Sequence, residues 1–136
     1  MTNSLTVKGW NEITMNQGIK TIIYPVKDII RAKTLFRKLV GVEPYVDQPY
    51  YVGFRVGDQE IGLVQESLAT RQWNVPNDHK VGMTAFYHVE NIKQSLQSLM
   101  DVGAQIQLDI KDVGGGKLTA IVRDADGNII GLIQSP

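Results

Sequence analysis

One histidine and two arginines in this sequence are candidates for catalysis or ligand binding, because of their side chains and of their positions relative to the predicted strands and turns. His88 lies near the end of a run of apolar and aromatic residues, and its imidazole can act as a base or as a hydrogen-bond donor near neutral pH. Arg55 and Arg123 each precede a turn, and the planar fork of a guanidinium is suited to binding a carboxylate or a phosphate. The three residues therefore point to acid–base chemistry or to the binding of an anionic group.

Each of these residues also has a structural interpretation. No carboxylate or nucleophile is found at a spacing that would pair it with His88, which fits a histidine that is solvated or bonded to a neighbour at a strand end. The arginines can pair at the surface with Asp58 and Asp124. Both interpretations stay open for all three residues.

Three aromatic residues form a second candidate set. Tyr51, Phe86 and Trp73 could form a wall around a planar ligand. Aromatic residues on strands also fill hydrophobic cores, so Tyr51 and Phe86 fit either role. Trp73 stands in a polar segment, and we expect it to be covered by the ligand-binding groove or by a partner subunit.

An internal repeat predicts the elements that position these side chains. Ile61-Gly-Leu-Val-Gln65 reappears as Ile130-Gly-Leu-Ile-Gln134. In the same way, Thr21-Ile-Ile-Tyr24-Pro-Val26 is matched 63 positions later by Thr84-Ala-Phe-Tyr87-His-Val89. A duplication within 136 residues indicates two similar modules that share one core, with a cleft possible where they meet.

Local patterns give each module the order βαβββ. In the first module we expect a strand over 20–26, a helix capped by Asp28 and stopped by Gly41, and strands over 42–46, 50–56 and 60–65. In the second we expect a strand over 83–89, a helix capped by Asn91 and ended by Gly103, and strands over 105–109, 118–123 and 129–134. Leu35, Leu39 and Met100 are expected on the apolar faces of these helices.

The expected organisation is one α+β domain. It comprises an N-terminal extension over 1–17 and a single domain over 18–136, with module one at 18–66, a polar connector at 67–81 and module two at 82–135. Because side chains alternate between the two faces of a strand, some are expected to face the helices and the others a groove on the opposite side of the sheet. The groove is predicted to be lined by Thr21, Ile23, Gly62, Val64, Thr84, Phe86, His88, Gly131 and Ile133.

Composition narrows the function classes. Fourteen basic and fourteen acidic residues cancel, so there is no bulk reason for the chain to attract nucleic acid or an anionic membrane. The absence of cysteine excludes disulfides, thiolate ligands and thiol nucleophiles. No apolar run approaches the ~20 residues that a membrane span requires. We therefore expect a cytoplasmic protein with neither nucleic acid nor membrane as partner.

Three stretches resemble the vicinal oxygen chelate fold, the superfamily of glyoxalases, bleomycin-resistance proteins and extradiol dioxygenases. They are Val26-Lys-Asp28 after a strand, the helix end at Gly41, and Asp124-Ala-Asp-Gly-Asn128 before the last apolar strand. The resemblance covers about residues 18–135 and implies two βαβββ modules.

The resemblance also implies where metal ligands should stand. Metal-dependent members of this superfamily carry His, Gln or Glu at four positions, which correspond here to Thr21, Thr84, Gly62 and Gly131. A divalent ion needs several donors, whereas glycine has no side chain and a neutral hydroxyl is a poor sole ligand. We therefore expect no metal and no cofactor in this groove. The two glycines are also expected to leave room for a ligand.

These observations predict a metal-free protein that binds a small organic molecule. The resemblance to bleomycin-resistance proteins implies a homodimer that sequesters a compound such as an antibiotic, and the groove residues favour a neutral or anionic aromatic one. The expected ligand-binding residues are Thr21, Ile23, Tyr51, Arg55, Gly62, Trp73, Thr84, Phe86, His88, Arg123 and Gly131. The alternatives are a lyase, isomerase or dioxygenase with a relocated metal site or with His88 as base, and a partner-binding module with a vestigial groove.

Overall fold

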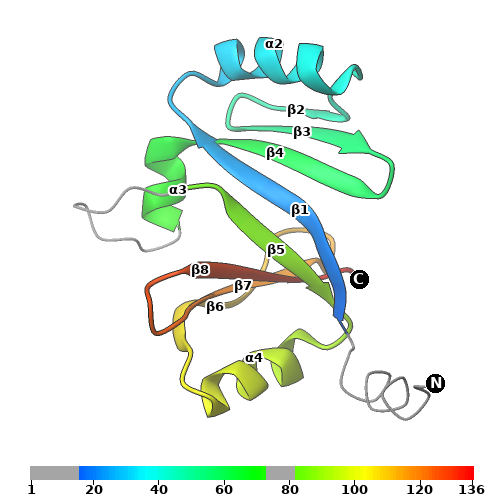
Figure 1. Ribbon diagram of the computed structural model, residues 1–136. Helices are drawn as coiled ribbons and strands as arrows, with labels where there is room; N and C mark the ends of the chain where they lie inside the picture. Colours follow the sequence, from blue (N-terminus) through cyan, green and yellow to red (C-terminus); the bar gives the residue numbers. More distant parts are fainter. Residues whose placement is uncertain (1–15, 73–81) are drawn as a thin grey trace, which may run out of the picture.

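The computed structural model describes residues 16–72 and 82–136, so Trp73 lies outside the described residues. Within them, one eight-stranded sheet and three helices confirm the predicted α+β class (Figure 1). The elements are β1 (Asn16–Val26), α2 (Ile29–Val40), β2 (Val46–Asp47), β3 (Tyr51–Val56), β4 (Gln59–Gln65), α3 (Glu66–Gln72), β5 (Thr84–Val89), α4 (Ile92–Asp101), β6 (Gln105–Asp112), β7 (Leu118–Arg123) and β8 (Ile129–Gln134).

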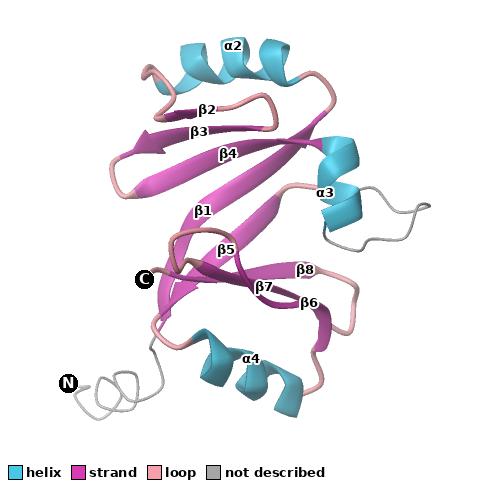
Figure 2. Ribbon diagram, turned by 180° about the vertical axis from the view of Figure 1, so that it is seen from behind, coloured by secondary structure: helices cyan, strands magenta, loops and turns pink. Residues whose placement is uncertain are grey.

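The sheet topology repeats between the two halves. The strand order is β2-β3-β4-β1-β5-β8-β7-β6. The first strand of each half pairs in parallel with the last strand of the same half, β1 with β4 and β5 with β8. The halves join where β1 and β5 run antiparallel, which Figure 2 shows at the middle of the molecule. The sequence repeat therefore corresponds to two structural modules within one sheet.

The predicted caps define where α2 and α4 begin. The Asp28 carboxylate accepts hydrogen bonds from the backbone N–H groups of Ile30 at 3.1 Å and Arg31 at 3.0 Å. Asn91 accepts from the N–H of Gln94 at 3.0 Å. At the other end of α2, Gly41 adopts a φ of 75°, a left-handed conformation that suits glycine.

Helices α2 and α4 cover the outer face of the sheet, each over its own module. Tyr24 and Val26 pack toward α2, and Tyr87 and Val89 pack toward α4, as the strand alternation predicted. The expectation for Leu35 and Leu39 was wrong, because these side chains are 59% and 70% exposed. The side of α2 that contacts the sheet is instead formed by Ile29, Ala32, Phe36 and Val40.

Met100, near the end of α4, is also more exposed than its spacing predicted, at 39%. The buried residues of α4 are Ile92 and Leu96, in its first half. The last turn therefore contributes less to the core than the helical periodicity suggested.

Two elements differ most from the sequence prediction. The segment after β4 was predicted only as a polar connector, but it begins with α3, and Ala69 of this helix is fully buried. The strand expected over 42–46 is reduced to the two residues of β2, Val46 and Asp47. Pro44 has no backbone N–H to donate, which disfavours pairing along the earlier part of that segment.

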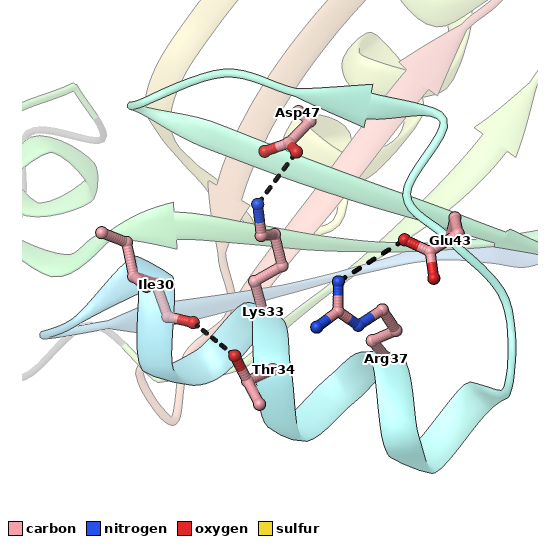
Figure 3. A network of polar contacts seen from close by, with 6 residues as sticks. All are labelled: Ile30, Lys33, Thr34, Arg37, Glu43 and Asp47. Atoms are coloured by element: carbon pink, nitrogen blue, oxygen red, sulfur yellow. Dashed lines mark hydrogen bonds and ion pairs between the residues drawn. The ribbon is translucent and has the colours of Figure 1, made fainter.

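Polar contacts connect α2 to β2 and to the segment that leads to it (Figure 3). Lys33 Nζ lies 2.9 Å from Asp47 Oδ2, and Arg37 Nη1 lies 3.5 Å from Glu43 Oε1. Exposed pairs of this kind contribute little to stability. Among the described residues, no helix is long and apolar enough to cross a membrane.

Candidate functional site

The face of the sheet opposite α2 and α4, which we call the inner face, carries the residues predicted to line the groove. Ile23, Val64, Phe86 and Ile133 pack there in one buried cluster. Ala69 of α3 belongs to the same cluster, and α3 directly follows β4. The inner face is therefore covered by α3 at the end where β4 finishes, and its apolar centre is occupied by the protein's own side chains.

The two glycines on this face do not leave room for a ligand, contrary to the sequence prediction. A Cβ atom at Gly131 would lie 2.5 Å from Cδ2 of Phe86. A Cβ atom at Gly62 would collide with the Tyr51 hydroxyl and would lie 2.6 Å from Cδ1 of Ile23. The space above each glycine is thus filled by an aromatic neighbour, which places Tyr51 and Phe86 within the packing of the inner face.

The two threonines at the other superfamily ligand positions are buried, at 5% exposure for Thr21 and 2% for Thr84. The Thr21 hydroxyl oxygen lies 2.9 Å from Nε2 of His88. The Thr84 hydroxyl donates to the carbonyl of Gly82 at 3.3 Å. The two hydroxyls are already hydrogen-bonded within the protein, and neighbouring side chains cover the two glycines. Together these four residues do not provide the ligands that a divalent cation needs. Across residues 16–72 and 82–136, no group of three His, Cys, Asp or Glu side chains is arranged to hold a metal ion.

His88 is half-buried on β5, and its hydrogen-bonding partner was not predicted from the sequence. Burial, followed by the charges of Lys20 and Lys117, lowers the pKa of His88 below its ordinary value, and Glu60 opposes this effect. The imidazole is therefore neutral near pH 7. The partner was missed because Thr21 is 67 residues away in the sequence and meets His88 only through the pairing of β1 with β5.

A second polar group on the inner face contains two residues that the sequence prediction missed. Tyr51 donates its hydroxyl to Oε2 of Glu60 at 2.7 Å, and the Tyr45 hydroxyl donates to the same oxygen. We call these three residues the tyrosine–glutamate cluster. Burial and Glu60 raise the pKa of Tyr45 to about 12, and they also raise the pKa of Tyr51.

The tyrosine–glutamate cluster extends to an arginine through the Tyr45 ring. Cζ of Arg55 lies 4.3 Å from the centroid of that ring. The ring also lies close to Gly53, where a Cβ atom would be 3.1 Å from Cε1 of Tyr45. Glu60 could have been found by strand alternation, because it precedes Gly62 by two residues, but nothing in the sequence around Tyr45 points to this contact.

Strand register brings these groups into one row. Arg55 pairs with Glu60, Glu60 pairs with Thr21, and Thr21 pairs with Phe86, so the row crosses β3, β4, β1 and β5. Glu60 lies near the start of β4, whereas α3 follows the end of that strand. We call this end of the inner face, with Tyr45, Arg55, Glu60, Thr21 and His88, the polar end.

The two arginines do not come together, and neither pairs with the aspartate considered for it. Four strands separate β3, which carries Arg55, from β7, which carries Arg123. Arg123 donates from Nη2 to Oε1 of Gln105 at 3.3 Å. Asp58 instead lies 3.9 Å from Nζ of Lys20.

The observed fold agrees with a comparison of the sequence with known protein families. The sequence profile of the Glyoxalase/Bleomycin resistance protein/Dioxygenase superfamily matches residues 18–132. The chain belongs to this superfamily. No curated protein matches the sequence significantly.

Solved structures show the same fold at low sequence identity. Methylmalonyl-CoA epimerase from Mycobacterium tuberculosis is similar with a TM-score of 0.68 and 15% identity, over 91% of this chain and 92% of that chain. A hypothetical protein from Bacillus halodurans C-125 has a TM-score of 0.68 and 14% identity, over 90% and 96% of the two chains. A Mn(II)-bound glyoxalase from Novosphingobium aromaticivorans has a TM-score of 0.64 and 14% identity, over 88% of this chain and 39% of that chain.

Proposed function

We propose that this superfamily member binds a small organic molecule at the polar end of its inner face, without a metal ion at the superfamily's ligand positions. The observation that carries the proposal is the contrast between the two parts of this face. The four ligand positions hold engaged hydroxyls and covered glycines. At the polar end, by contrast, Arg55 is exposed, Tyr45 is 44% exposed and His88 is only half-buried.

The difference between the modules supports a ligand with an apolar body and a polar group. Arg55 pairs with Glu60 in module one, and the corresponding pair in module two is Arg123 with Ile129. Ile129 packs against the buried cluster, so the second module lacks the carboxylate of the first. A neutral or anionic aromatic compound matches a surface with polar groups on one side and apolar groups on the other. Sequestration of such a compound, including an antibiotic, by a homodimer is the role that we propose.

A ligand screen on protein stripped of metal tests this function. The protein is treated with EDTA, its metal content is measured, and a panel of aromatic acids, amides, amines and antibiotics is screened by thermal shift. We expect at least one compound to raise Tm because it binds only the folded state, and we expect added Zn²⁺ or Mn²⁺ to leave its affinity unchanged. If no compound binds, or if binding requires stoichiometric metal, the proposal is wrong.

One observation favours a second candidate, proton transfer by His88. The Thr21 hydroxyl lies 2.9 Å from Nε2, and the lowered pKa keeps the imidazole neutral and able to accept a proton. An isomerase or lyase could use this group as its base. The test is the exchange of acidic C–H protons into D₂O, followed by NMR on a panel of 2-substituted carbonyl acids. Exchange that the wild type catalyses and His88→Gln does not would support this candidate, and the absence of exchange in the wild type would remove it.

A further inference from the structure

We propose that the ligand of the polar end carries a carboxylate and that Arg55, stacked on Tyr45, is the residue that binds it. This inference rests on the proposed binding function and names the chemical class of its ligand. It depends on the position of the Arg55 side chain, on the absence of an ion-pair partner for it in the described parts of the chain, and on the different surroundings of Arg123 in the second module.

The Tyr45 ring forms a fixed support for the guanidinium. On the sheet side it packs against Gly53, where even a methyl group would approach ring atoms of Tyr45 and Tyr51 to 3.1 Å. At its hydroxyl end the ring is held by the carboxylate of Glu60. Cζ of Arg55 lies 4.3 Å from the ring centroid. Arg55 also makes a side-chain hydrogen bond to Tyr45. The remaining N–H donors lie in the plane of the guanidinium and can contact a carboxylate.

Arg55 forms no ion pair with a carboxylate in the described parts of the chain. Asp58, two positions beyond the end of β3, is 3.9 Å from Lys20. Glu60 is the cross-strand neighbour of Arg55, but its Oε2 accepts hydrogen bonds from both tyrosines of the cluster. Arg55 is therefore an exposed cation in an ordered stack, without an ion-pair partner among residues 16–72 and 82–136, and an external oxyanion can complete this arrangement.

Two lysines near the polar end add positive charge to that of Arg55, against the negative charges of Glu60 and of Asp58, which lies 3.9 Å from Lys20. Lys20 and Lys117 are close enough to His88 to lower its pKa by their charge. Lys20 is adjacent to Thr21, the β1 member of the row that contains Arg55. Two strand spacings of ~4.8 Å separate Arg55 on β3 from Thr21 on β1, so the backbones of these two residues lie roughly 10 Å apart. An aromatic acid is long enough to place its carboxylate at Arg55 and its ring over the apolar centre of the inner face.

The second module provides a matched control. Arg123 has the same place in its module as Arg55, because it pairs with Ile129 as Arg55 pairs with Glu60. The guanidinium of Arg123 donates to Gln105 at 3.3 Å, so part of its hydrogen-bonding capacity is already used within the protein. The two arginines make the same contribution to net charge but differ in their surroundings.

The experiment compares two compounds that differ only in the charged group. Affinities of 1-naphthoate and 1-naphthamide are measured by titration calorimetry on the wild-type protein, Arg55→Gln and Arg123→Gln, each confirmed as folded by circular dichroism. We expect the wild type to bind the acid roughly tenfold or more tightly than the amide, the scale of a charge-assisted hydrogen bond. We expect Arg55→Gln to remove this preference and Arg123→Gln to retain it. Arg55→Lys should retain only part of it, because an ammonium lacks the planar fork.

The outcomes separate this inference from the function on which it rests. If acid and amide bind the wild type equally, or if the preference survives in Arg55→Gln, the assignment of Arg55 is overturned while the binding function stands. If Arg123→Gln and Arg55→Gln reduce the preference by the same factor, net charge rather than the stack is responsible, and the assignment also fails. If neither compound binds at all, the result counts against both proposals.

Discussion

The carboxylate of Glu60 connects the phenols of Tyr45 and Tyr51, which are six residues apart in the sequence, and this contact determines how the polar end responds to high pH. Tyr45 comes from the segment before β2 and Tyr51 from the start of β3. Both hydroxyls donate to the same oxygen of Glu60. A phenolate at either position would face this carboxylate at close range. The folded state therefore favours the neutral form of both tyrosines.

We predict a loss of stability at alkaline pH that depends on this cluster. The pKa of Tyr45 rises from its ordinary value of 10.0 to about 12, and that of Tyr51 is also raised. Because the folded-state values lie above the unfolded value, their contribution is complete below pH 10 and is lost as the pH rises from 10 toward 12. Urea unfolding at pH 8 and pH 11 should show a larger loss of stability in the wild type than in Tyr45→Phe/Tyr51→Phe. Equal losses in the two proteins would contradict this.

His88 should produce the opposite dependence in mildly acidic solution. Its pKa is below the ordinary value of 6.5 because of burial and the charges of Lys20 and Lys117, with Glu60 opposing them. The contribution to stability is present above pH 6.5 and declines as the pH falls through that value, because the unfolded state then binds the proton more readily. When the pH is lowered from 7.5 to 5.5, the Tm of the wild type should therefore decrease more than the Tm of His88→Gln. The idea fails if the variant loses as much.

The glycine at position 131 is required by its neighbour rather than by a ligand. A Cβ atom there would lie 2.5 Å from Phe86, so we expect Gly131→Ala to destabilise the fold by about 1–3 kcal/mol, the usual cost of overpacking. Gly82→Ala is the control, because a Cβ at Gly82 meets nothing within 4 Å, and it should change stability by less than about 0.5 kcal/mol. The measurement is chemical denaturation of both variants. Equal stability of the two variants would show that Phe86 moves aside at no cost.

At the scale of elements, the bounds of helices and strands were predicted most accurately where a capping residue or a turn defines the end of the element. The strands at 118–123 and 129–134 were predicted with their observed bounds, and Asp28 and Gly41 delimit α2 as expected. Helix α3 was missed because its sequence, ESLATRQ, is mostly polar and offers only Leu68 and Ala69 as apolar residues. Two buried or partly buried positions give no readable helical period, so this helix depends on packing against the inner face.

The cap of α2 provides a test at this scale. Asp28 accepts from two N–H groups of the first turn, so Asp28→Ala should lower the free energy of unfolding by about 1 kcal/mol. Asp28→Ser keeps an oxygen acceptor and should cost less. Urea denaturation of both variants measures the difference. If serine and alanine are equivalent, the side-chain hydrogen bonds contribute nothing to α2.

For the whole molecule, the repeat predicted the modules but not the site between them. Two copies of one pattern indicate two halves of a sheet, and the structure has that arrangement. The contact of Thr21 with His88, and the row from Arg55 to Phe86, depend on how β1 registers against β5. The register shifts near Ile19, and such an irregularity cannot be read from strand alternation. The sequence therefore predicted which face the residues occupy but not which of them meet.

The measurement that tests the central proposal most directly is an NMR titration of EDTA-treated, ¹⁵N-labelled protein with 1-naphthoate. We predict that amide shifts concentrate at the polar end, around Arg55, Glu60 and His88, and saturate without added metal. The other candidate surface is a pocket of about 310 Å³ on the outer face, which Ile29 of α2 and Asp47 of β2 help to line. Shifts confined to that pocket, or no saturable shifts anywhere, would contradict a ligand site at the polar end.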